Sequence, residues 1–189
     1  MWAGLIRPEA LKTRPARLRS DRNSQPLGQP AVERFMALST LIPPGGVTAE
    51  LAATSRKQAL VGLAELAERA LGVAARPVLD AVIEREKLGS TGVGDGVAIP
   101  HARTDLVDRV CGVFARLKNP VDFDAIDGQP ADLIFLLLAP EDAGADHLKA
   151  LAQVSRFFRR EELRRAVRAA PDADAVAALL NNGVESDAA

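Results

Sequence analysis

Two segments in the first half of the chain carry hydrophobic residues at helical spacing. The first opens with the capping box Ser55-Arg56-Lys57-Gln58. The second is predicted to begin at Pro77, because proline suits the first helical position, and to end at Gly89. We therefore expect two consecutive helices. Their apolar faces consist of Leu60, Leu63, Ala64, Ala67 and Leu71 in the first and of Val78, Leu79, Val82 and Ile83 in the second.

Other apolar runs are short and have the character of strands. Residues Gly45 to Leu51 precede the first helix, and Val97 to Ile99 form an apolar segment ended by Pro100. Val110 to Leu117 is a further strand. The run from Ala131 to Ala139 is apolar at nearly every position, which is typical of a strand buried on both faces. Such a strand indicates a sheet with helices on both sides.

The last part of the chain returns to helical spacing. Asp146 is predicted to cap a helix, and shorter helices are expected at Glu161 to Ala169 and Asp172 to Leu180. The order of strand, two helices, strands and helices predicts an α/β fold of about 150 residues, in which helices cover both faces of one mixed sheet. The face of the helix after Asp146 is expected to hold Leu148, Leu151, Ala152, Ser155 and Phe158.

Residues 1–35 differ in composition from the rest of the chain. They contain seven Lys or Arg, three acidic residues and four prolines, with little apolar periodicity. We predict a disordered basic extension of charge +4, followed by a domain at 36–189 of charge −5. Met36 is a credible alternative translation start. An upstream extension is therefore favoured over a basic arm that binds nucleic acid or membrane.

Composition and charge exclude several classes of protein. The chain is 48% hydrophobic and 26% charged, with a formal net charge of −1, so no bulk attraction to nucleic acid or anionic lipid is expected. Neither an 18-residue apolar window nor a secretory signal is present, which predicts a cytoplasmic protein without stable membrane insertion. Cys111 is the only cysteine, so a buried, reduced thiol is expected.

The glycine-rich segment Gly89 to Gly96 invites comparison with nucleotide-binding loops, but it has the wrong context. A dinucleotide fingerprint follows a strand and opens a helix, whereas this loop follows a helix and opens a strand. A Walker Gly-Lys-Ser/Thr, a His-Glu-x-x-His and a Gly-x-Ser-x-Gly are all missing from the sequence. We therefore expect no cofactor and no metal.

The two histidines are the strongest candidates for chemistry. His101 follows an apolar strand, at the carboxyl end where α/β sheets commonly open into a ligand crevice. His147 comes directly after the expected cap Asp146, beside free backbone N–H groups and the positive end of a helix dipole. Both positions suit a phosphate. The alternative is that each is an ordinary structural or surface histidine.

A longer pattern around His101 adds a family resemblance. The run Glu84 to Arg103, which contains Gly89-Ser90-Thr91-Gly92 and Ile99-Pro100-His101, resembles the signature of fructose/mannitol-type IIA components of the bacterial phosphoenolpyruvate-dependent phosphotransferase system. Pro120 to Pro130, Leu133 to Pro140 and His147 to Ala152 resemble its nitrogen-regulatory branch. The resemblance covers about residues 36–182 and implies a mainly five-stranded mixed sheet between helical layers.

The resemblance also implies roles for individual residues. His101 would be the histidine that is phosphorylated, and His147 and Arg85 would be the second active-site histidine and the arginine. A neutral imidazole attacks phosphorus without prior deprotonation, and fixed donors then stabilise the equatorial oxygens. Ser90 or Thr91 would add a hydroxyl to the phosphate site. Arg103 is expected either to steer the phosphoryl group or to be an ordinary exposed residue.

Two smaller questions stay open at the level of sequence. Arg85 alone would suit a solvated helix end, paired with Glu84 or Glu86. The glycine loop fits equally well a tight turn that needs positive φ and a loop whose amides contact phosphate.

The resemblance implies a small histidine-phosphorylated carrier protein as donor. The regulated target proteins are not identified by the sequence, and a homodimer is compatible with it. The favoured function is a phosphoryl carrier that regulates other proteins through its phosphorylation state. One alternative is a IIA component that passes phosphate to a IIB protein during sugar uptake. Another is a pure binding module in which His101 is never phosphorylated.

Overall fold

The computed structural model describes residues 38–182. The predictions for residues 1–35, and the domain boundary at residue 36, lie outside this range. No helix within residues 38–182 combines the length and the apolar character needed to cross a bilayer.

A mixed sheet forms the centre of the fold, as predicted. Its strands follow the order β1-β5-β6-β3-β2, and β4 also pairs with β6. The central pair β5 and β6 is antiparallel, whereas β1 lies parallel to β5, and β3 and β4 lie parallel to β6. The strands are β1 (Val47–Leu51), β2 (Gly92–Gly94), β3 (Val97–Ala98), β4 (His101–Arg103), β5 (Cys111–Val121) and β6 (Ala131–Ala139).

The sheet has six strands where the resemblance implied mainly five. Both β3 and β4 run along the same side of β6, with Val97 opposite Leu133 and His101 opposite Leu137. Pro100 separates them, because proline has no N–H to donate to the ladder. Its carbonyl still accepts from Leu137 N at 2.9 Å. The two short strands therefore occupy one position in the sheet.

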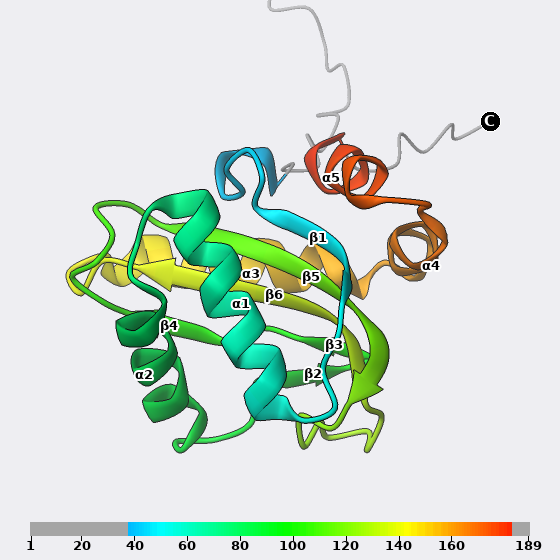
Figure 1. The fold of residues 1–189 in the computed structure, drawn as a ribbon, viewed down its shortest axis with the longest axis horizontal. Coiled ribbons are helices and arrows are strands. Elements are labelled where there is room, and N and C mark those ends of the chain that lie inside the picture. Colours follow the sequence, from blue (N-terminus) through cyan, green and yellow to red (C-terminus); the bar gives the residue numbers. More distant parts are fainter. Residues whose placement is uncertain (1–37, 183–189) are drawn as a thin grey trace, which may run out of the picture. The chain divides into compact units, whose positions relative to one another are not determined.

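Helices cover both faces of the sheet (Figure 1). Helices α1 and α2 pack on one face, in front of the sheet in this view, and α3 lies behind it. Helices α4 and α5 pack on the same side as α3. The bounds are η1 (Leu38–Thr40), α1 (Arg56–Leu71), α2 (Ala75–Glu86), α3 (Gly144–Arg159), α4 (Glu161–Ala169) and α5 (Ala173–Asn182).

Strand β6 joins the two hydrophobic cores. Its side chains alternate, so that Ile134, Leu136 and Leu138 belong to the core under α1 and α2. Leu133, Phe135 and Leu137 belong to the core under α3, α4 and α5. All six side chains are at most 1% exposed. The prediction of a strand buried on both faces is confirmed.

The first two helices begin almost as predicted. Ser55 caps α1 and accepts from Gln58 N at 3.3 Å, as the capping box requires. The reciprocal bond is displaced by one residue, because the Gln58 side chain accepts from Thr54 N at 2.8 Å. Helix α2 begins at Ala75, so Pro77 is its third residue and not its first. Proline is tolerated there because the first four helical N–H groups have no intrahelical acceptor.

Helix α3 begins earlier than predicted. It starts at Gly144 with Ala143 as the capping position, so Asp146 lies in the first turn and is not the cap. The predicted apolar face was wrong at Leu148, which is 63% exposed, but right at Phe158, which is 2% exposed. His147 was not included in the predicted buried face, although it belongs to the observed one. The buried face consists of His147, Ala150, Val154, Phe157 and Phe158.

The glycine-rich loop forms a hairpin. Strands β2 and β3 are antiparallel, and Gly94, Asp95 and Gly96 at their junction have φ of 91°, 56° and 77°. Positive φ at successive residues is what a tight hairpin turn demands, and glycine adopts it at no steric cost. His101 is the first residue of β4, so the expectation that it leaves a strand end is also corrected.

Candidate functional site

Three residues from distant parts of the chain meet beside β4. His101 is the first residue of β4, His147 lies in the first turn of α3, and Arg85 lies in the last turn of α2. The centroids of the two imidazole rings are 5.4 Å apart. Arg85 Nε donates to His101 Nε2 at 3.0 Å. The structure thus brings together the three residues that the sequence singled out.

The hydrogen bonds of His101 define the tautomer of its ring. Arginine can only donate, so Nε2 must be the acceptor in the bond from Arg85. Nδ1 lies 2.9 Å from the carbonyl oxygen of Ile99, which can only accept. The neutral ring therefore carries its proton on Nδ1 and its lone pair on Nε2.

The surroundings of His101 keep its ring neutral. Burial lowers its pKa below the usual 6.5, because it disfavours the charged form. The bond to the Ile99 carbonyl opposes this effect, and the positive charge of Arg85 adds to it. Near pH 7 Nε2 is consequently unprotonated, and its lone pair accepts the bond from Arg85.

His147 is more enclosed and has fewer partners. Its side chain is only 6% exposed, and neither ring nitrogen has a hydrogen-bond partner within residues 38–182. Burial lowers its pKa, and His101, Arg103 and Arg85 lower it further by charge repulsion. A buried polar group without a partner is costly. An anion held between the two imidazoles would relieve this cost by accepting from His147.

Arg103 contributes a further positive charge to the site. It lies two residues after His101 in β4, and alternate residues of a strand point to the same side. The Arg103 side chain is exposed, and its charge acts on His147.

Arg85 has neutral partners, since Nη1 donates to the Gly89 carbonyl at 3.2 Å. Neither predicted ion-pair partner of Arg85 serves it, because Glu84 pairs with Lys87 and Glu86 accepts from Thr91.

Ser90 and Thr91 lie in the segment that links α2 to β2. Ser90 Oγ donates to the carbonyl of Phe123, and Thr91 Oγ1 donates to Glu86 Oε1. Each hydroxyl has one proton, and a protein oxygen already takes it. Both residues therefore fix the shape of the segment and offer a phosphate no free hydroxyl proton.

The hairpin turn lies at the far end of the position beside β6 that β3 and β4 share. Val97 faces Leu133, whereas His101 faces Leu137, so about 13 Å of strand separates the turn from His101. The amide of Asp95 at the turn donates to Asp127 Oδ2 at 2.8 Å. This placement favours the tight-turn interpretation of the glycine loop.

Two groups that shape the site were not identified from the sequence. The Ile99 carbonyl holds the imidazole, and nothing in the sequence marks a backbone oxygen for this role. Glu86 follows Arg85 directly and was considered only as an ion-pair partner. A carboxylate beside the arginine and five residues before a threonine was the available signal.

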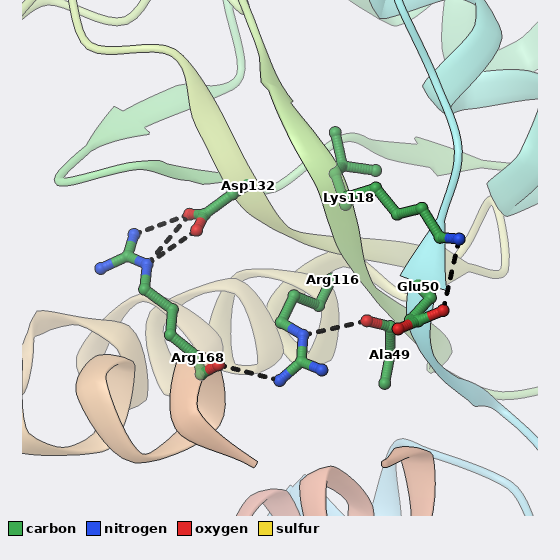
Figure 2. Close-up of a pocket in the computed structure, with 7 residues that line it drawn as sticks. Ala49, Glu50, Arg116, Lys118, Asp132 and Arg168 are labelled. Atoms are coloured by element: carbon green, nitrogen blue, oxygen red, sulfur yellow. Dashed lines mark hydrogen bonds and ion pairs between the residues drawn. The ribbon is translucent and has the colours of Figure 1, made fainter. Parts of the chain in front are cut away.

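Positively and negatively charged side chains also line a hollow of about 470 Å³ at the surface (Figure 2). Arg168 forms a forked pair with Asp132, and Lys118 pairs with Glu50 at 3.3 Å. Arg116 donates to the Ala49 carbonyl and to carbonyls at the end of α4. The charged side chains that line this hollow thus bind one another or backbone carbonyls and stabilise the fold. Residues 38–182 contain no group of three His, Cys, Asp or Glu side chains placed to hold a metal.

Residues 40–183 match the family described as phosphoenolpyruvate-dependent sugar phosphotransferase system, EIIA 2. The chain belongs to this family. A nitrogen regulatory protein of Bradyrhizobium diazoefficiens is 47% identical over 145 residues, which are 77% of this chain and 95% of that protein. A fructose-specific EIIA component of Haloferax volcanii is 38% identical, over 78% of this chain and 97% of that protein.

Solved structures agree with the fold. The nitrogen regulatory IIA protein of Neisseria meningitidis has a TM-score of 0.69 at 36% identity, covering 76% of this chain and 99% of that chain. The mannitol IIA protein of Escherichia coli has a TM-score of 0.60 at 21% identity, over 75% and 96%. Membership of the EIIA family gives the chain a role in phosphoryl transfer within the phosphotransferase system.

Proposed function

We propose that this protein is a nitrogen-regulatory phosphoryl carrier that is phosphorylated on Nε2 of His101. The observation that carries the proposal is the pair of hydrogen bonds on the His101 ring. Arg85 donates to Nε2, and Nδ1 faces the Ile99 carbonyl. This pairing leaves the lone pair on the nitrogen that faces a guanidinium, which is a donor suited to phosphoryl oxygens.

The donor in this proposal is a small carrier protein with a phosphohistidine. His101 Nε2 attacks the phosphorus and forms a new N–P bond. The N–P bond of the donor breaks, and its electron pair returns to the donor nitrogen, which leaves as neutral imidazole. Nδ1 of His101 keeps its proton, so no general base is needed. Since both bonds are phosphohistidine bonds, the exchange is close to balanced and reversible.

The neighbours of His101 supply the charge that the transferring group needs. Arg85 would exchange its bond to Nε2 for bonds to the phosphoryl oxygens, and His147 would donate an N–H to another oxygen. Arg103 would steer the incoming anion from the exposed side of β4. Ser90 and Thr91 are assigned to the shape of the segment, because their protons are already committed.

The output of the proposed carrier is regulation of partner proteins in the cytoplasm. The highest identity among the relatives described above is to a nitrogen regulatory protein, which favours this output. Phosphorylation adds close to two negative charges to the surface around His101, and such a change can admit or expel a partner that packs there. Transfer to a IIB protein for sugar uptake is the second candidate, favoured by the similarity to a fructose-specific EIIA component.

Intact-mass measurement tests the proposal. The full chain is incubated with phosphoenolpyruvate, the first enzyme of the system and the small phosphocarrier. We expect a gain of one acid-labile phosphate that is lost in His101→Ala. Retention of the phosphate in folded His101→Ala would refute the assignment. Adding a IIB protein and its sugar then separates the two outputs, because only the uptake component loses its phosphate to the sugar.

We also retain the proposal that residues 36–189 form the functional domain and residues 1–35 an extension. A chain lacking residues 1–35 should accept phosphate at the rate of the full chain. A large loss of folding or transfer would show that the boundary is misplaced.

A further inference from the structure

Arg85 and the Ile99 carbonyl hold the two nitrogens of the His101 ring. A hydrogen bond between the side chains of Glu86 and Thr91 links these two groups. On one side Arg85 Nε donates to Nε2, and Arg85 is followed directly in α2 by Glu86. Glu86 Oε1 accepts from the Thr91 hydroxyl. On the other side the Thr91 carbonyl accepts from Ile99 N at 2.9 Å, and the Ile99 carbonyl faces Nδ1 of His101. These contacts form a closed ring that begins and ends at the imidazole.

Glu86 and Thr91 are buried, as a fixed link requires. The Glu86 side chain is 8% exposed, and Thr91 is 5% exposed. Ion pairs and hydrogen bonds to charged groups are stronger in such surroundings than in water. The second oxygen of Glu86 lies 3.8 Å from Arg56 Nη1, which compensates its charge. Arg56 is in turn held by Asp124, at 2.6 Å.

The intervening segment is held as well. Ser90 Oγ donates to the Phe123 carbonyl and accepts from Gly92 N at 3.0 Å. Gly89 supplies the carbonyl that takes Arg85 Nη1. The Gly89 to Thr91 segment therefore holds one nitrogen of the guanidinium through the Gly89 carbonyl. The Glu86 to Thr91 bond closes this segment against the end of α2.

We propose that Glu86, acting through Thr91, is a positioning residue that sets the distance and angle between the Arg85 guanidinium and the His101 imidazole. The inference rests on the proposed function, because it assigns Glu86 and Thr91 a part in the same transfer. Neither residue touches the reacting atoms. In-line transfer is sensitive to small misplacements of the reacting groups, so loss of the link reduces the rate of transfer more than the binding of the donor.

Thr91→Val is the central test, because valine keeps the shape of threonine and removes its hydroxyl. In the full chain we expect the rate of transfer at saturating phosphocarrier to fall roughly 10-fold, with half-saturation within about twofold of the parent. Thr91→Ser keeps the hydroxyl and should restore most of the rate. Thr48→Val, at a half-buried position in β1 on the other edge of the sheet, is the matched control and should transfer at the parent rate.

A second measurement does not depend on the donor. Nitrogen NMR of the His101 ring in the unphosphorylated protein should show the proton on Nδ1 in the parent and a mixture of both tautomers in Thr91→Val. Glu86→Ala should give the same mixture, and Glu84→Ala, at an exposed position one residue before Arg85, should not.

The outcomes separate the two proposals. Parental rate and parental tautomer in folded Thr91→Val would overturn the positioning role and leave His101 as the acceptor. If the parent itself accepts no phosphate, the proposed function fails, and a changed tautomer in Thr91→Val would still support the link. A rate lost equally in Thr91→Ser and Thr91→Val would overturn the role of the hydroxyl. Should Thr91→Val fail to fold, the comparison of Thr91→Ser and Glu86→Ala with the parent decides.

Discussion

Charged side chains are paired differently at the two ends of the position beside β6 that β3 and β4 share. At the hairpin end, Arg168 forms a forked pair with Asp132 and also donates to the Asp95 carbonyl. Arg164 pairs with the Asp95 carboxylate at 3.1 Å. Every cation named here has an anionic partner. This end fastens α4 to the sheet.

At the His101 end neither Arg85 nor Arg103 pairs with an acidic side chain of residues 38–182. Arg85 donates to an imidazole and to a carbonyl, and Arg103 extends toward solvent beside the buried His147. Burial lowers the pKa of His147, and repulsion from His101, Arg103 and Arg85 lowers it further. Positive charge without an anionic partner attracts an anion, whereas a paired charge stabilises the fold. The difference in pairing distinguishes the proposed reactive end from the structural end.

Removing Arg85 should have the largest effect on transfer. Arg85→Ala deletes the donor that faces His101 Nε2, and we expect a fall in the rate of phosphoryl transfer of about 100-fold. A stopped-flow or quenched-flow time course of phosphorylation measures it. Since Glu84→Ala changes a neighbouring exposed residue, it serves as the control. A parental rate in Arg85→Ala would remove the guanidinium from the site.

Removing His147 should have a smaller effect. His147→Ala takes away one N–H donor and leaves the acceptor His101 in place, so we expect the rate to fall about 10-fold while the protein still takes up one phosphate. Lys149→Ala, at an exposed position on the same helix, controls for changes in α3. Full retention of the rate would mean that the phosphoryl group does not use His147.

Lower pH should slow transfer and weaken the fold by the same cause. The pKa of His101 lies below 6.5 in the folded protein, chiefly because of burial, so its ring becomes protonated only below that value. We expect the transfer rate to decline with falling pH and to reach half its maximum at a pH below 6.5. Donor phosphorylation is held constant by using purified phosphocarrier at each pH. A midpoint of the decline above pH 6.5 would contradict the lowered pKa.

The same shift has a consequence for stability. The unfolded chain binds protons near pH 6.5, whereas folded His101 and His147 bind them only at lower pH. The free energy of unfolding should therefore fall as the pH decreases from 6.5 through the folded pKa values. Urea denaturation across this range, compared with a His101→Ala and His147→Ala double variant, isolates the contribution of the two rings.

Arg168 tests the other end of the comparison and should give the smallest effect on transfer. Arg168→Ala leaves Asp132 and the Asp95 carbonyl without their donor, so we expect a loss of about 1 kcal/mol in the free energy of unfolding. The transfer rate should stay at the parental value. A drop in rate comparable to that of Arg85→Ala would show that the two ends are coupled.

Most of the sheet and the helices could be predicted because their signals are local. Strand β6 is buried on both faces, which gives a continuous apolar run in the sequence. Helix α1 is buried on one face, which gives apolar residues at helical spacing. The prediction of the buried face of α3 was partly wrong, because the sequence of this helix offers two overlapping apolar faces. Only packing against the sheet could decide that His147 faces inward and Leu148 outward.

The sequence by itself determined the candidate histidines, the arginine and the family pattern around them, because residue identity and spacing are properties of the chain. Only the tertiary structure decided which nitrogen of His101 carries the lone pair. That choice depends on Arg85 from α2 and on the Ile99 carbonyl, and on their distances to the ring. The direction of a hydrogen bond depends on where donor and acceptor lie in space. It therefore cannot be read from the spacing of residues along the chain.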